Sequence, residues 1–420
     1  MLVGAVPRIR IPALPASPFK TGHLPLLAGL SLTRIIGWGS TYYAPAVLAP
    51  ALGRDLGLSP STIFGGVTLL LLTGAALAPA VGRELDRSGT RNALCLGTVI
   101  CALGLGFIAL AQGPVSYLAS WVVIGIGHSL MLANVGSVTV AQVLGSQARR
   151  AIGLMMLVTG LAPSVFWPLT SLLLEAQGWR ATLLIFAALH LLVSLPIHAL
   201  VPRGRVGPHV AAEADADLAG QRGRLPQAAR REGFWLVALA FSASGLVSWG
   251  LPLNLIGLFR QSGLSEAEAV WIATLGGPAT LAARAIDAML GEKLPVEKVA
   301  LIGLMVGPLL CFSLAFVPLT VAVGATFVVL FNAALGVIAV ARATLPLFLF
   351  GRTGFATMMG KLTVPQNLAF AAAPLLFAVL MERAGAVPTL LASAAIQSIG
   401  FVAMLLLVRM LGRPAATGRP

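Results

Sequence analysis

Residues 82–91 read Gly-Arg-Glu-Leu-Asp-Arg-Ser-Gly-Thr-Arg, and this short charged stretch decides the fold. It lies between two long apolar segments of a chain in which only 10% of the residues are charged. A glycine at the end of a membrane helix allows a neighbouring backbone to approach closely. An acid there can accept charge-assisted hydrogen bonds from helix-end amides or from an arginine. The pattern G-x-x-x-D-R-x-G-x-R therefore indicates a specialised turn between two helices.

The composition around this turn is that of a membrane protein. The chain has 420 residues, 58% of them apolar, and a mean hydropathy of +0.93, which excludes a soluble globule. Crossing a bilayer takes about 20 apolar residues, and the backbone must then be helical. Twelve such segments are expected near 24–52, 60–81, 92–112, 116–143, 152–175, 181–201, 233–258, 267–290, 299–318, 320–345, 357–380 and 388–410.

The net charge of +14 is a topology signal. Of the 28 Lys and Arg residues, 21 lie in the tail 1–23, the turn 82–91, the segment 202–232 and the C-terminal end 409–420, or at Arg149, Arg150, Lys293, Lys298, Arg352 and Lys361. The positive-inside rule then places both termini and the central segment in the cytoplasm. We expect a multi-pass protein of the cell membrane, the inner membrane if the source is bacterial. Its partner is the lipid bilayer and not nucleic acid.

The chain divides into two nearly equal halves. We expect a cytoplasmic tail 1–23, a six-helix half 24–201, a cytoplasmic linker 202–232, a second six-helix half 233–411 and a tail 412–420. The triplet Gly57-Leu58-Ser59 recurs as Gly263-Leu264-Ser265, and each serine can cap the helix that follows. The repeat predicts related halves.

In sequence and setting, the turn 82–91 resembles the signature loop between the second and third helices of the major facilitator superfamily. The resemblance implies an all-α membrane protein with twelve transmembrane helices in two pseudo-symmetric six-helix halves. It also implies secondary transport by rocker-switch alternating access. A role in gating follows by resemblance for Gly82, Asp86, Arg87, Gly89 and Arg91.

Further motifs resemble the monocarboxylate-porter branch and related bacterial carriers. They are the start of the bundle at 37–45, the basic start of the fifth helix at 147–154, and Gly178-Trp179-Arg180. The branch's lysine on the first helix is missing, with Ala46 beside Pro45, and its acid on the eighth helix is Thr280. We expect a small, anionic, monocarboxylate-like substrate, with proton coupling as one option. The alternative is proton-driven efflux of drugs or toxic compounds.

Polar residues inside the predicted helices mark the candidate substrate site, because a charge in the membrane is costly unless it meets water or a partner. Arginine offers a planar fork of donors that suits a carboxylate. In the resembled fold, helices 1, 4, 7 and 10 line the cavity. The expected substrate-binding residues are Arg34, Trp38, Arg284, Asn254 and Asn332. Each could instead tie helices together, and Arg342 is expected to snorkel toward the interface.

Two residues are candidates for proton coupling, Asp287 and His128. Asp287 follows Arg284 by three residues on one helix, so the two can pair. Protonation of Asp287 would free Arg284 for an anion. The alternatives are that Asp287 only neutralises Arg284, in a uniporter or exchanger, and that His128 has a packing role.

Other functional classes find no support in the sequence. It contains no catalytic motif such as H-E-x-x-H or G-x-S-x-G, and no P-loop. We therefore expect that the protein is not an enzyme and that it has no catalytic residue, cofactor or metal. Cys95, Cys101 and Cys311 are expected to be packing residues. The remaining partner is the small-molecule substrate, and the carrier is expected to be a monomer.

Overall fold

The structure is a computed structural model that describes residues 24–132, 135–144, 148–202, 225–290, 295–350 and 355–411, and the regular elements in these ranges are all helical. The first half contains α1 (Leu24–Trp38), the π-helical turn η2 (Gly39–Tyr43), α2 (Pro45–Leu56), α3 (Pro60–Ser88), α4 (Thr90–Ala109), α5 (Pro114–Met131), α6 (Val135–Leu144), α7 (Ala148–Thr159), α8 (Ala162–Leu189), the π-helical turn η4 (His190–Ser194) and α9 (Leu195–Ala199). The second half contains the short helix η5 (Gln227–Ala229), α11 (Arg230–Gln261), α12 (Glu266–Thr274), α13 (Gly276–Leu290), α14 (Val296–Phe316), α15 (Val321–Phe350), α16 (Phe355–Ala384) and α17 (Ala386–Leu411). The all-helical expectation is confirmed.

Ten stretches of the described residues are long and apolar enough to cross a membrane. One of them, 151–199, has 49 residues and would extend about 74 Å if it were straight, more than two bilayer cores. Gly178 interrupts it with φ +77, so it supplies two crossings. The predicted first span, 24–52, is divided among α1, η2 and α2 and is not among the ten. With it, the helices correspond one to one to the twelve predicted segments.

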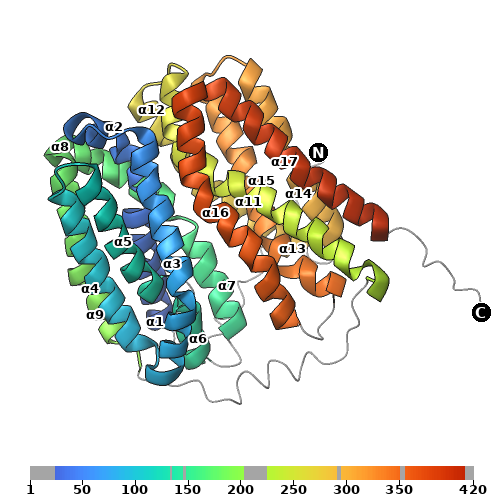
Figure 1. Cartoon of the computed structure of the whole chain (residues 1–420), viewed down its shortest axis with the longest axis horizontal. Coiled ribbons are helices and arrows are strands. Elements are labelled where there is room, and N and C mark those ends of the chain that lie inside the picture. Colours follow the sequence, from blue (N-terminus) through green and yellow to red (C-terminus); the bar gives the residue numbers. More distant parts are fainter. Residues whose placement is uncertain are drawn as a thin grey trace, which may run out of the picture.

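The two halves lie side by side, from blue to green and from yellow to red in Figure 1. One hydrophobic core lies almost wholly within residues 27–201, and it also takes Leu253 and Ala378 from the second half. A second core joins Ala46, Val47 and Trp167 to residues 247–394. The halves are therefore packed against each other. Large apolar side chains face outward, Leu192 with 76% and Leu172 with 66% of their surface exposed, as a bundle in lipid requires.

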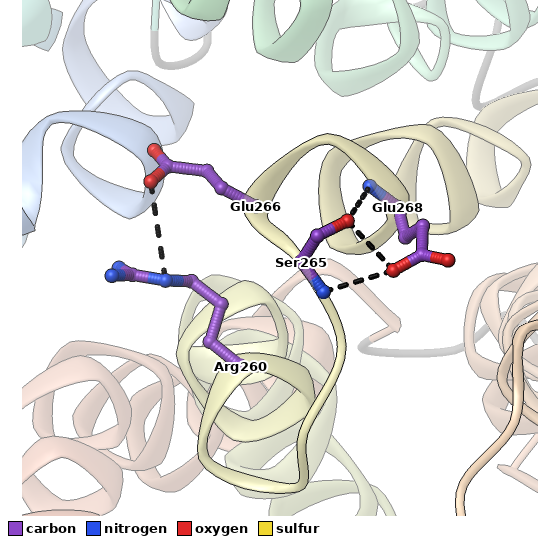
Figure 2. Close-up of polar contacts among 4 residues, drawn as sticks. All are labelled: Arg260, Ser265, Glu266 and Glu268. Atoms are coloured by element: carbon purple, nitrogen blue, oxygen red, sulfur yellow. Dashed lines mark hydrogen bonds and ion pairs between the residues drawn. The ribbon is translucent and has the colours of Figure 1, made fainter.

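The upper end of the bundle in Figure 1 holds the connections α2–α3, α11–α12 and α16–α17. Gly57 and Gly263 turn the chain there with φ of +65 and +99. Ser59 accepts a hydrogen bond from the Thr62 N–H, and Ser265 accepts one from the Glu268 N–H at 3.3 Å. Figure 2 shows this second cap, with Arg260 3.9 Å from Glu266 beside it. The caps predicted from the repeated triplet are present.

Candidate functional site

Six aromatic rings form a cluster where the two halves meet. Trp38 and Tyr42 come from the first half, and both lie edge to face with Trp249 of α11, with ring centroids 5.8 and 5.3 Å apart. Trp249 in turn stacks on Phe370 of α16 at 5.1 Å. The Tyr42 hydroxyl donates a hydrogen bond of 2.7 Å to the Trp249 carbonyl. The remaining two rings extend the cluster from Tyr42 to Tyr43 and then to Trp167.

Most of this cluster was missed from the sequence, in which only Trp38 was a candidate. Trp249 and Phe370 carry no motif, and aromatic residues are common in membrane helices. Two sequence features could have suggested it. Tyr42 and Tyr43 are consecutive aromatic residues, and Trp249 is followed directly by Gly250. The glycine matters, because a Cβ at Gly250 would lie 2.8 Å from the Ala373 carbonyl oxygen of α16. Close packing of α11 on α16 brings Phe370 to Trp249.

Arg34 is buried and ties α1 to the end of α5. Its Nη1 donates a hydrogen bond of 2.7 Å to the carbonyl of Leu132, the residue that caps α5. Such a carbonyl has no donor within its own helix. The Nε of Arg34 has no hydrogen-bond partner among the described residues. The contact seen at Arg34 is thus a hydrogen bond between two helices, and its Nε–H is without a partner among the described residues.

His128 is buried next to Arg34. Its ring meets Trp38 edge to face at 4.8 Å, and its Nε2 makes no hydrogen bond within the described part of the chain. Two more buried histidines bridge helices by hydrogen bonds. His190 Nε2 lies 2.9 Å from Ser40 Oγ, and His198 lies between the Thr98 and Thr33 hydroxyls at 2.7 and 3.0 Å. The three histidines are therefore buried polar residues between the helices of the first half, and two of them form hydrogen bonds between helices.

Arg284 of α13 and Arg342 of α15 form the cationic part of the site. Both are half-buried, and they lie close enough for their positive charges to repel. Arg342 lies over the Phe370 ring at 5.2 Å, and Arg284 lies within electrostatic range of Tyr43. The ion pairs Arg180–Asp55 and Arg260–Glu266 involve neither of them. Arg342, expected only to snorkel, instead faces the aromatic cluster.

The expected pairing of Arg284 with Asp287 is not formed. Both residues are described, and no ion pair joins them. The Nε of Arg284 also lacks a partner among the described residues. Spacing of three residues permits a pair on a helix, but it is weak, about 0.2–0.5 kcal/mol. Arg284 is therefore left without a carboxylate in the described part of the chain.

The two candidate asparagines use their amide nitrogens within their own helices. Asn254 donates to the Gly250 carbonyl and Asn332 to the Val328 carbonyl, each at 2.9 Å. The backbone carbonyl oxygen of Asn332 accepts a 3.2 Å hydrogen bond from Thr280 Oγ1 and so joins α15 to α13. The structure brings Asn332 to the packing surface between these helices.

The turn at 82–91 is one residue long in the structure. Gly89 alone separates α3 from α4, and its φ of +76 favours glycine. The close approach expected at Gly82 is not seen among the described residues, none of whose neighbouring atoms lies within 4 Å of a Cβ built there. The side chains of Asp86 and Arg87 lie outside the described residues. Arg91 lies in the first turn of α4, within electrostatic range of Cys95.

A cavity of about 360 Å³ opens at the upper end between α2, α8 and α12. Asp55 lines it and accepts a 2.7 Å hydrogen bond from Trp179 Nε1, while Glu266 lines it from the other half. No cluster of three or more His, Cys, Asp or Glu side chains suited to a metal occurs among the described residues.

A helical membrane bundle in two halves, with polar and charged side chains gathered at their contact, is the architecture of a transport protein. The family model of the Major Facilitator Superfamily matches residues 30–368, and the chain belongs to this family. The resemblance seen in the turn is thereby confirmed at the level of the superfamily. The family indicates a secondary transporter rather than an enzyme.

Solved structures agree on the fold. A bacterial homologue of the human lysosomal transporter Spinster, in its inward-facing and occupied conformation, superposes with a TM-score of 0.72 at 16% identity, over 93% of this chain and 98% of that one. A mutant of the nucleoside transporter NupG gives a TM-score of 0.71 at 11% identity, over 92% of this chain and 99% of that one. An uncharacterised 38 kDa protein of Thermoproteus tenax is 28% identical over 176 residues, which are 41% of this chain and 46% of that protein. The match thus spans less than half the length of this relative.

Proposed function

We propose that this carrier moves a small organic anion, of the monocarboxylate type, by alternating access. The observation that carries the proposal is the pair Arg284 and Arg342, two cations within repulsive range that form no ion pair with a described carboxylate. Buried cations need a partner or water. A substrate carboxylate would neutralise one of the two positive charges, and its two oxygens could accept hydrogen bonds from both guanidinium groups.

The position of the pair suits a central site that opens on one side. Arg284 lies 18 residues past the start of α12, about 27 Å along the chain from the upper end, whereas Trp249 lies about 18 Å from that end. The aromatic cluster therefore lies between the arginines and the upper end. If both termini are cytoplasmic, as the charge distribution predicts, the upper end faces outward and the arginines are reached from the cytoplasm. The fold likeness to an inward-facing homologue is consistent with that orientation.

The proposal is tested by uptake into proteoliposomes that contain the purified chain. We expect uptake of at least one of radiolabelled lactate, pyruvate, propionate and benzoate, with competition among the anions and no uptake of the organic cation tetraphenylphosphonium. Uptake of none of the anions would contradict the proposal.

Efflux of drugs or toxic compounds is the second candidate, favoured by the six aromatic rings of the site. Aromatic faces attract apolar compounds and organic cations. The unpaired arginines repel cations and so favour anions. Transport of tetraphenylphosphonium or ethidium by the same proteoliposomes, without anion uptake, would establish efflux instead.

A first prediction concerns the charged turn. Asp86→Asn is expected to lower the transport rate at least tenfold with little change in the amount of folded protein, because it removes a charge from a gating turn and no packing. Initial uptake rates and the gel-filtration profile check this result. Asp86→Glu, which keeps the charge, is the matched control and should stay near the wild-type rate. A normal rate in Asp86→Asn would remove the gating role.

A second prediction concerns coupling. If Asp287 binds the transported proton, Asp287→Asn is expected to abolish the acidification of the liposome lumen that accompanies anion uptake, while exchange of labelled for unlabelled anion continues. A pH dye inside the liposomes measures the first and counterflow the second. Proton movement that persists in Asp287→Asn would exclude this residue, and His128→Gln becomes the variant to compare.

A further inference from the structure

The helix that carries Arg284 is broken between α12 and α13. The break occurs at Leu275 and is followed by Gly276, Gly277 and Pro278. In a continuous helix the Thr274 carbonyl would accept a hydrogen bond from the N–H of residue 278. Residue 278 is proline, which has no N–H. The sequence thus leaves the Thr274 carbonyl without a donor from its own helix.

A serine of the other half takes the place of that donor. The Ser164 hydroxyl of α8 donates a hydrogen bond of 2.6 Å to the Thr274 carbonyl. The same oxygen accepts a hydrogen bond of 3.1 Å from the N–H of Gly277. One side chain from the first half therefore satisfies both backbone groups on the two sides of the break.

Ser164 is itself next to a helix break. Regular helical geometry is interrupted at Gly160 and Leu161, between the end of α7 and the start of α8. Pro163 follows in the first turn of α8. The two breaks lie against each other, since a Cβ at Gly277 would collide with Ser164 Oγ and would lie 3.2 Å from the Gly160 carbonyl oxygen. Only glycine at 277 permits this approach. The backbones of the two halves are thus in close contact at these two breaks, and we call this contact the junction.

The junction is linked mechanically to the cationic pair. Arg284 lies two turns beyond Gly277 on α13. Thr280, between them, donates its hydroxyl to the Asn332 carbonyl of α15, and α15 also carries Arg342. The position of α13 therefore determines where Arg284 lies relative to Arg342.

We propose that Ser164 is a positioning residue that couples closure of the two halves to the geometry of the anion site. Its hydroxyl holds the broken α12–α13 geometry only while the halves are in contact at this level. When they separate, the Thr274 carbonyl and the Gly277 N–H lose their shared partner and α13 moves relative to α12, taking Arg284 with it. The effect on the anion rests on the proposed function, whereas the effect on closure does not.

The closure is measured without any substrate. Spin labels are placed at the upper end on Val115→Cys and Val387→Cys, whose side chains are 82% and 46% exposed, in a Cys95→Ser background. Distances are recorded for the full chain in nanodiscs. Loss of two hydrogen bonds in Ser164→Ala is expected to shift the ratio of long to short distances about tenfold toward the long, open form. The control is Ser398→Ala, which should match the wild type, because among the described residues the Ser398 hydroxyl donates to the Ala394 carbonyl of its own helix.

A double-mutant cycle tests the specific mechanism. Pro278→Ala restores an N–H that can bond to the Thr274 carbonyl within the helix. In that background Ser164→Ala should change the distance ratio less than about twofold, because the serine is no longer needed. Ser164→Thr keeps the hydroxyl and should remain near the wild type. An equal shift from Ser164→Ala in both backgrounds, or no shift in either, would overturn the proposal.

Anion binding then separates this inference from the proposed function. With labelled lactate and benzoate as ligands, Ser164→Ala should weaken the binding that the wild type shows in proportion to its distance shift. If the wild type binds no anion while the distances shift as described, the proposed substrate class is wrong and the closure role of Ser164 stands. Wild-type anion binding with unchanged distances in Ser164→Ala would show the reverse.

Discussion

Arg284→Gln and Arg342→Gln are each expected to weaken anion binding by about ten- to a hundredfold. A hydrogen bond to a charged group contributes about 1.5–3 kcal/mol, and about 1.4 kcal/mol is a factor of ten in affinity. Glutamine removes the charge and the paired donors of the guanidinium. Each variant also relieves the repulsion between the two cations, so the folded protein should be no less stable than the wild type. Concentration dependence of anion uptake, together with thermal melting, measures both effects.

Three comparisons sharpen this test. Arg284→Lys keeps a charge but loses the planar fork, and is expected to recover only part of the affinity. Arg260→Gln, at the upper end and paired with Glu266 at 3.9 Å, should leave the affinity unchanged. Arg34→Gln should lower the melting temperature, because it removes the donor to the Leu132 carbonyl. Unchanged kinetics in both Arg284→Gln and Arg342→Gln would exclude the pair as the anion site.

Gly127→Ala is expected to destabilise the first half by about 3 kcal/mol or more, enough to lose most of the folded protein. A Cβ at Gly127 would lie 2.6 Å from the Cys101 amide nitrogen and 2.7 Å from the Gly97 carbonyl oxygen of α4. These are backbone atoms, so a side-chain rotation cannot relieve the clash. Small residues at such positions are what allow membrane helices to pack closely. Yield of monodisperse protein and its melting temperature measure the loss.

The matched control is Gly106→Ala on α4. Among the described residues, no neighbouring atom lies within 4 Å of a Cβ at Gly106, and alanine is favoured over glycine in a helix by about 1 kcal/mol. This variant should therefore fold as well as the wild type or better. Equal yields for Gly127→Ala and Gly106→Ala would mean that α4 and α5 are not packed as described.

Much of the fold followed from local sequence. Crossing segments are recognised by apolar length, because lipid leaves backbone groups no partner outside the helix. Helix starts at Ser59 and Ser265 were predicted from the residue types that cap helices, and the contacts are within three residues. The close approach expected at Gly82 is not seen among the described residues, because a glycine in sequence does not say whether a neighbour is near. The break at Gly178 also followed from the sequence, since the predicted segments end at 175 and begin again at 181 on either side of it.

The sequence by itself determined the membrane setting, the helical architecture and the superfamily. It also showed which arginines lie within the membrane-spanning helices. Only the tertiary structure decided which of these groups meet. It left Arg284 without Asp287 and placed Arg342 within its electrostatic range, and it placed Ser164 against a break 110 residues away in the chain. The physical reason is the range of the interactions. Hydropathy, capping and proline effects act within one helix, whereas charge repulsion, ring packing and a serine bridging two halves depend on how helices distant in sequence are packed.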